Sequence, residues 1–339
     1  MSIVRFLLKR LVLLVPILVG LVTVTFILSH VIPGDPVALA AGEAAPQETI
    51  ERLRVEFGLD KPLYVQYYKF WINLSKGDLG RSLMTHRPVR EDIIRFFPAT
   101  LELSALALLI AVIVGVSSGV ISAVRKHGFL DHSLRLISIS GVSIPKFWLA
   151  LLVQLVAAGT GILPISGRIG TFVEPPQNIT GLYILDSLLT MNWEAFSSSV
   201  SHIILPAFTL SFAIIGLTQR MTRANMLDVL GQDYVLNAYA AAGLPETIVN
   251  FKYSLKNSLI PVVSQVALNL GGLLAGSLLV ETVFNWPGIG LYIINAANYD
   301  DYQPILGGVL VTGIIFVIVN LFADIFYKVV DPRIRYEDK

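Results

Sequence analysis

Two side-chain amides stand inside a long apolar stretch, where few neighbouring residues can offer them a hydrogen bond. Gln265 and Asn269 lie within Leu259–Val280, which also contains Ser277 and several glycines. Amides are costly in hydrocarbon unless they find a partner, and glycines permit bending and close approach of helices. A polar substrate path is therefore predicted, although a packing interface explains the glycines equally well. The predicted path residues are Gln265, Asn269, Gly272, Gly276 and Ser277.

Motifs typical of nucleotide-binding proteins and zinc proteases do not occur in the sequence. It contains no G-x-x-x-x-G-K-[ST] and no H-E-x-x-H. His30, His86 and His202 stand alone, and the chain has no cysteine. We therefore expect a protein that is not an enzyme, binds no metal and no cofactor itself, and draws any energy from another protein.

The composition is typical of a membrane protein. Charged residues make up 14% of the chain and hydrophobic residues 54%, whereas soluble domains carry about 25% charged residues. A net charge of +1 argues against a nucleic-acid partner and leaves the lipid bilayer as the expected environment.

Six apolar stretches approach the length of about 20 residues that a bilayer span requires. They are Leu11–Ser29, Leu103–Val124, a stretch within Leu134–Ala158, Ile203–Gln219, Leu259–Val280 and Ile305–Phe326. Basic residues gather in alternate short loops, which predicts that both termini are cytoplasmic. A cleaved signal peptide is the alternative for the first stretch, but its apolar core is too long, so we expect an uncleaved anchor.

Several polar residues near these spans allow more specific predictions. Lys146 either begins a helix late, near the cytoplasmic surface, or lies inside the bundle, where a charge is usually functional. Glu102 is expected to lie at the membrane interface rather than to act as a ligand. Leu182–Phe196 is expected to form one amphipathic helix at the same interface. Asn320 and Asp324 are expected to make hydrogen bonds between helices.

These patterns predict an all-α integral membrane protein with six transmembrane helices. Residues 1–30 would form the cytoplasmic N-terminus and first span, and residues 31–98 a polar extracytoplasmic insert. Residues 99–330 would form a core of five helices, and residues 331–339 a cytoplasmic tail. Nine basic and nine acidic residues between Asp35 and Arg95 nearly cancel, which is typical of a small folded insert.

A polar hairpin at residues 232–258 interrupts the apolar pattern. The alanine-rich run Asp233–Ala242 predicts a short helix that ends at Gly243. Pro245 would open a second helix in its first turn, with Ile248, Phe251 and Leu255 on one face. Small side chains on the first helix would let another protein approach closely, which suggests a lever; an ordinary solvated loop is the alternative.

The Gly243 bend and the following Leu259-Ile260-Pro261 resemble the cytoplasmic EAA loop of ABC importer permeases, specifically the dipeptide, oligopeptide and nickel group. Asn237-Ala238-Tyr239 stand where that family has Glu-Ala-Ala. Six further segments resemble the family in order along the chain: PGDP at Pro33–Pro36, GDLGRS at Gly77–Ser82, TLELSALALLIAVIVG at Thr100–Gly115, SIPKFW at Ser143–Trp148, ETVFNWPGIG at Glu281–Gly290 and the terminal DPRIR.

This resemblance implies a type I ABC importer permease fold in the cell inner membrane. It implies docking of the hairpin on an ATPase through Asp233, Ala238, Tyr239, Ala240, Gly243, Leu244 and Pro245. The implied partners are a second homologous permease subunit, two ATP-binding subunits that hold ATP and Mg, and an extracytoplasmic binding protein that delivers dipeptides or oligopeptides. Nickel complexes or glutathione are alternative cargoes, and an ion-coupled secondary transporter or a non-transporting scaffold are alternative functions.

Overall fold

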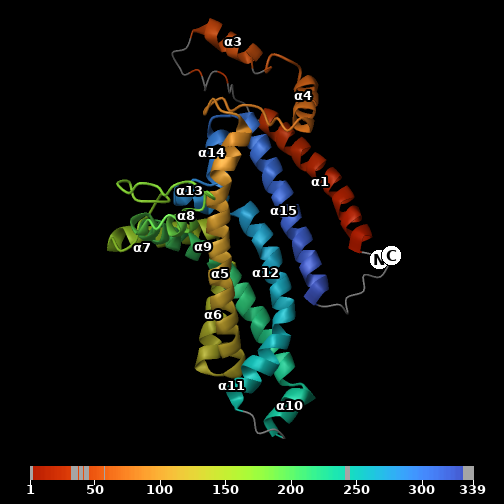
Figure 1. Ribbon diagram of the computed structural model, residues 1–339, viewed down its shortest axis with the longest axis vertical. Helices are drawn as coiled ribbons and strands as arrows, with labels where there is room; N and C mark the ends of the chain where they lie inside the picture. Colours follow the sequence, from red (N-terminus) through yellow and green to blue (C-terminus); the bar gives the residue numbers. More distant parts are fainter. Residues whose placement is uncertain are drawn as a thin grey trace.

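The computed structural model describes residues 3–31, 37, 41, 46–56, 58–240 and 245–330. Regular secondary structure in these ranges is helical, and an isolated bridge joins Arg81 to Pro88. The molecule is elongated, with α3 and α4 at one end and α10 and α11 at the other (Figure 1). The predicted all-α fold is confirmed.

Long helices alternate with short ones along the chain. Their bounds are α1 Ile3–Val31, α3 Gln47–Glu56, α4 Leu63–Ser75, α5 Val89–Val124, α6 Phe129–Ser143, α7 Lys146–Thr160, α8 Tyr183–Leu189, α9 Trp193–Leu230, α10 Asp233–Ala240, α11 Glu246–Ile248, the π-helical segment η1 Val249–Leu255, α12 Lys256–Gly276, α13 Leu278–Val283, α14 Ile289–Asn298 and α15 Tyr302–Val330.

Four helices among the described residues are long and apolar enough to cross a membrane. They are α5, α9, the run Glu246–Leu274 and Tyr302–Ala323 of α15. The pair α6 and α7 passes the same test as one bent span, and Val15–Leu28 of α1 is a shorter apolar stretch. The chain is thus an integral membrane protein with several spans.

A sharp bend divides the segment in which the third span is expected. α6 ends at Ser143 and α7 begins at Lys146, and the two helices are bent by 110°. A residue before proline is driven out of the helical conformation, and Ile144 is extended with φ −81° and ψ 125°. The third span is therefore not one straight helix. α7 begins at Lys146, whose side chain is half-buried, and the position of Lys146 near the cytoplasmic surface stays a prediction.

The predicted amphipathic helix Leu182–Phe196 is also divided. α8 ends at Leu189, and Met191 adopts a positive φ of 54°. Asn192 then caps α9, because its Oδ1 accepts a hydrogen bond from the backbone N–H of Ala195 at 3.0 Å. The prediction of a single helix here is wrong, because this cap starts a new one.

Close packing of α5 on α9 forms the centre of the fold. A Cβ atom built at Gly115 would lie 2.7 Å from Cβ of Thr218, and one built at Gly119 would lie 2.6 Å from Cβ of Thr222. Such a G-x-x-x-G pair lets two helix backbones approach within a membrane. No side chain larger than glycine fits at these two positions without moving α9.

Candidate functional site

The predicted path residues lie on and beyond α12. Gln265 Nε2 donates to Asn269 Oδ1 at 3.4 Å, and both side chains are half-buried. Asn269 Nδ2 is buried and has no hydrogen-bond partner within the described chain. Gly272 is exposed, with no atom within 4 Å of a Cβ built there. Residues at this spacing share one helix face, so α12 presents an amide pair beside an open glycine.

The neighbouring face of α12 is occupied by α15. A Cβ built at Gly271 would lie 3.2 Å from Cδ2 of Phe316 and 3.4 Å from Oδ1 of Asn320. Asn320 therefore lies at the α12–α15 contact, whereas the side chain of Asp324 lies outside the described residues. Because α15 covers Gly271, the open face of α12 is the one that carries Gln265, Asn269 and Gly272.

Ser277 does not share that open face. Its side chain is 1% exposed, and its Oγ donates to Oε1 of Glu281 at 2.7 Å. Gly276 ends α12, and Ser277 lies between α12 and α13. The carboxylate four residues later accepts from the Ser277 hydroxyl and holds it in a buried network, and a role of Ser277 in the path stays a prediction.

Glu281 is the centre of that network, and the sequence analysis missed it. The Glu281 side chain is fully buried, and its Oε1 also accepts from Oγ1 of Thr100 on α5 at 2.8 Å. Its Oε2 accepts from the backbone N–H of Leu291 at 3.1 Å. Burial raises the pKa of the Glu281 carboxyl above its ordinary range. The signal available in the sequence was Ser277, one helical turn before the acid.

The segment after Glu281 closes around the same point. Trp286 Nε1 donates to the carbonyl of Ala99 at 2.9 Å, and the backbone N–H of Ile289 donates to Oγ1 of Thr100 at 2.9 Å. A Cβ built at Gly288 would collide with Glu281 Oε2 and Thr100 Oγ1. The motif ETVFNWPGIG therefore ties α13 and α14 to α5.

A second buried carboxylate lies on α5, two residues after Thr100. Glu102 is 7% exposed and pairs with Arg168, with Oε2 2.5 Å from Nη2. Its Oε1 accepts from the backbone N–H of Ile184 at 2.7 Å, and the Arg168 guanidinium lies 3.8 Å from the centroid of the Tyr183 ring. Glu102 is thus held in an ion pair inside the protein, and its position at the membrane interface stays a prediction.

The hairpin lies at the opposite end of the molecule (Figure 1). Val235 and Ala238 of α10 are buried with Val249 of η1, and Val229 and Leu230 of α9 pack against them. Asn257 Nδ2 donates to the hydroxyl of Tyr234 at 2.9 Å, which joins α10 to the start of α12. The hairpin is thus folded back on its flanking helices through a small apolar cluster.

The residues predicted for docking are distributed over this hairpin. Asp233 is exposed at the start of α10, and Ala238 faces the apolar cluster. Tyr239 and Ala240 end α10, but their side chains, like Gly243 and Leu244, lie outside the described residues. Pro245 precedes α11 in an extended conformation instead of occupying its first turn, because its ψ is 143°.

The second helix of the hairpin differs from the sequence prediction. Only Glu246–Ile248 is α-helical before the π-helical segment η1 begins. Ile248 and Phe251 are exposed, whereas Val249 is fully buried. The wider turn of a π-helix shifts side-chain positions away from α-helical spacing, so the predicted apolar face does not form.

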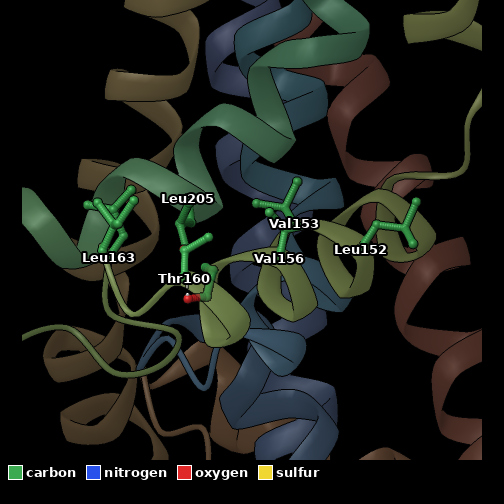
Figure 2. A pocket seen from close by; sticks show the side chains of 8 residues that line it. Leu152, Val153, Val156, Thr160, Leu163 and Leu205 are labelled. Carbon is green, nitrogen blue, oxygen red and sulfur yellow. Dashed lines mark hydrogen bonds between the residues drawn. The ribbon is translucent and has the colours of Figure 1, made fainter.

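A separate apolar hollow lies between α7 and α9 (Figure 2). It has a volume of about 390 Å³ and is lined by Leu152, Val153, Val156, Ala157, Thr160, Ile162, Leu163 and Leu205. The hydroxyl of Thr160 already donates to the carbonyl of Ala157 at 3.2 Å. Because the lining offers no free polar group, the hollow does not suit a polar substrate.

The fold and these sites define an α-helical membrane protein of several spans with a polar helix face and a terminal hairpin. The chain belongs to the family described as "Binding-protein-dependent transport system inner membrane component", which residues 113–336 match. Residues 3–104 match the companion family "Binding-prot-dependent transport system membrane comp, N-term".

Curated relatives match almost the whole chain. The probable D,D-dipeptide transport system permease protein DdpB of Escherichia coli is 44% identical over 95% of this chain and 94% of its own length. The dipeptide transport system permease protein DppB of Alkalihalophilus pseudofirmus is 42% identical over 97% and 98%. The glutathione transport system permease protein GsiC of Pectobacterium atrosepticum is 37% identical over 98% and 99%.

Proposed function

We propose that this chain is the permease subunit of an ATP-driven, binding-protein-dependent importer of dipeptides or oligopeptides. The observation that carries the proposal is the likeness, over nearly the whole length of both chains, to proteins named as dipeptide permeases. The proposed assembly contains a second homologous permease subunit, two ATP-binding subunits that hold ATP and Mg, and an extracytoplasmic binding protein.

The proposed topology has six spans of the type I importer fold with both termini in the cytoplasm. The spans would be α1, α5, the bent pair α6 and α7, α9, α12 and α15. Residues 31–98 would then form the extracytoplasmic insert, 99–330 the core and 331–339 a cytoplasmic tail. Support comes from Figure 1, where α3 and α4 of the insert and α10 of the hairpin lie at opposite ends of the molecule.

We propose that the hairpin 232–258 receives the movement of the ATPase and passes it to the path. In support, α11, η1 and α12 follow one another from Glu246 to Gly276 with no residue left outside a helix. Gln265 and Asn269 lie on the same helical run, so a displacement of the hairpin reaches the amide pair directly. Docking would use the α10 surface together with Gly243, Leu244 and Pro245.

The open face of α12 has the chemistry that a peptide requires. A peptide bond needs one donor and one acceptor partner when it leaves water. Gln265 and Asn269 carry both kinds of group, and Asn269 Nδ2, which is buried and has no partner within the described chain, would turn outward to donate to a peptide. Gly272 leaves space beside them. Half of the path would be formed by this chain and half by the second permease.

The test is uptake by the complete assembly in liposomes. The co-purified complex is reconstituted with ATP on the hairpin side and with a labelled dipeptide and the binding protein on the opposite side. ATP-dependent accumulation without an ion gradient is expected. Uptake that requires an ion gradient and ignores ATP would contradict the proposal. Competition by unlabelled glutathione tests the second cargo that the Pectobacterium relative suggests.

A further inference from the structure

A buried ion pair joins α6 to α9 close to the hairpin. Asp131, in the first turn of α6, is fully buried, and Arg223 on α9 is 18% exposed. Arg223 binds the carboxylate through two hydrogen bonds, from Nε to Oδ1 at 2.7 Å and from Nη2 to Oδ2 at 2.8 Å. A bidentate pair fixes both the distance and the orientation of its two helices.

The same carboxylate also holds α5. Ser122, near the end of α5, donates from Oγ to Asp131 Oδ1 at 2.5 Å. The backbone N–H of His127, in the loop between α5 and α6, donates to Oδ2 at 3.0 Å. Asp131 therefore accepts hydrogen bonds from α5, from the connecting loop and from α9. A single side chain links three helices at one end of the bundle.

Apolar contacts connect this link to the hairpin. Met226, three residues after Arg223, is fully buried with Val120 and Ala123 of α5, and Leu255 of η1 packs against them. Leu230, one turn further along α9, packs against the buried hairpin cluster that contains Val249. A displacement of the hairpin is thus delivered to α9 within about two turns of Arg223.

We propose that Asp131 and Arg223 are positioning residues for transport, which make α5, α6 and α9 move as one body when the hairpin moves. The inference rests on the proposed function of the hairpin. Further from the hairpin, α6 and α9 are also joined by the hydrogen bond from Ser138 Oγ to Gln219 Oε1 at 2.5 Å and by close packing of Gly216 on Ser138. Without the ion pair, the last turns of α9 beyond those contacts would follow the hairpin while the start of α6 lagged behind. Movement would then be absorbed at the α6–α9 contact before it changed the substrate path.

The test compares transport with ATP hydrolysis in the reconstituted assembly. The main variant is the double substitution Asp131→Asn and Arg223→Gln, which removes both charges and keeps polar side chains at both positions. A single substitution would leave a buried charge unpaired and endanger folding. We expect the number of peptides imported per ATP hydrolysed to fall about fivefold or more, because a coupling contact is lost. Matched controls are Arg220→Gln and Asp228→Asn, which lie exposed on α9 near the pair.

The readouts separate this inference from its rivals. If uptake and ATP hydrolysis fall together in proportion to the amount of assembled complex, the pair is only structural and the inference is overturned. An unchanged ratio in a fully assembled variant overturns it as well. The proposed function is judged separately, on the unsubstituted protein, because failure there abolishes ATP-dependent uptake before any variant is made.

Discussion

Buried carboxylates hold the region around α13 and α14, whereas small apolar side chains hold the hairpin at the far end of the molecule. Glu281 accepts hydrogen bonds from three other residues, and Glu102 is held by an ion pair and a backbone donor. The hairpin depends on the buried cluster of Val235, Ala238 and Val249 and on one hydrogen bond from Asn257.

This difference indicates separate mechanical roles. A buried carboxylate that accepts hydrogen bonds from the surrounding O–H and N–H groups makes its surroundings rigid. Moving any of these donors would leave a buried polar group unpaired. Small apolar contacts are non-directional, so they tolerate sliding. We infer that the α13–α14 region keeps its shape during transport while the hairpin moves.

The largest expected effect comes from a charge placed in the hairpin cluster. In Ala238→Glu, the carboxylate cannot stay against Val249 and must displace α10. We expect transport to fall to background while membrane insertion and assembly of the α13–α14 region remain. Peptide uptake and membrane-fraction yield are the measurements. Ala224→Glu, at an exposed position of α9 outside the docking surface, is the control. Normal uptake by Ala238→Glu would refute a moving hairpin.

The next effect concerns stability at the opposite region. Glu281→Ala leaves the hydroxyls of Thr100 and Ser277 and the backbone N–H of Leu291 without their acceptor. We expect the free energy of unfolding to fall by about 3 kcal/mol, measured by thermal unfolding in detergent. Glu281→Gln keeps one acceptor oxygen and is expected to lose less. If Glu281→Ala is as stable as the wild type, the network around Glu281 does not make this region rigid.

A smaller effect is expected on the open face of α12. Asn269→Ala removes an amide whose Nδ2 has no partner in the described chain, so stability should barely change. Uptake is expected to fall about fivefold, the equivalent of one hydrogen bond of about 1 kcal/mol. Leu268→Ala, at an exposed adjacent position, is the control. If Asn269→Ala lowers stability and leaves uptake intact, the amide has a packing role.

The smallest effect is a pH dependence at Asp301. Burial raises the pKa of this carboxyl, which accepts hydrogen bonds from Ser82 Oγ at 2.7 Å and from the backbone N–H of Met84 at 3.2 Å. A raised folded pKa means that the folded state binds the proton more tightly. Its stabilising contribution is therefore complete below the unfolded value of about 3.9 and is lost as pH rises through the folded pKa.

Thermal unfolding of wild type and Asp301→Asn across this pH range measures that contribution. We expect the wild type to lose stability relative to Asp301→Asn as the pH rises through the folded pKa of Asp301. A constant difference at every pH would show that Asp301 does not titrate during unfolding.

Local signals in the sequence predicted the parts of the fold that depend on neighbouring residues. The end of the second span at Val124 follows from Arg125 and Lys126, and α5 does end there. The start of α7 at Lys146 follows from Pro145, which drives the preceding residue out of the helical conformation. The amide pair on α12 was also accessible, because Gln265 and Asn269 are one helical turn apart.

Contacts between distant residues were not accessible in the same way. Glu102 pairs with Arg168, which lies 66 residues away, so nothing near Glu102 indicates that it is neutralised in the interior. The carboxylate of Asp131 meets Arg223 across 92 residues. Only folding brings such partners together, and they decide which charges belong to the interior.

The central claim is that the hairpin meets an ATPase, and a single cysteine at Asn237 tests it most directly. The natural chain has no cysteine, and Asn237 is exposed on α10. A cross-linker attached there is predicted to capture an ATP-binding subunit of the assembled complex, more strongly in one nucleotide state than in another. Labelling of the same cysteine by a membrane-impermeant thiol reagent added outside intact cells, with no ATPase captured, would contradict the account.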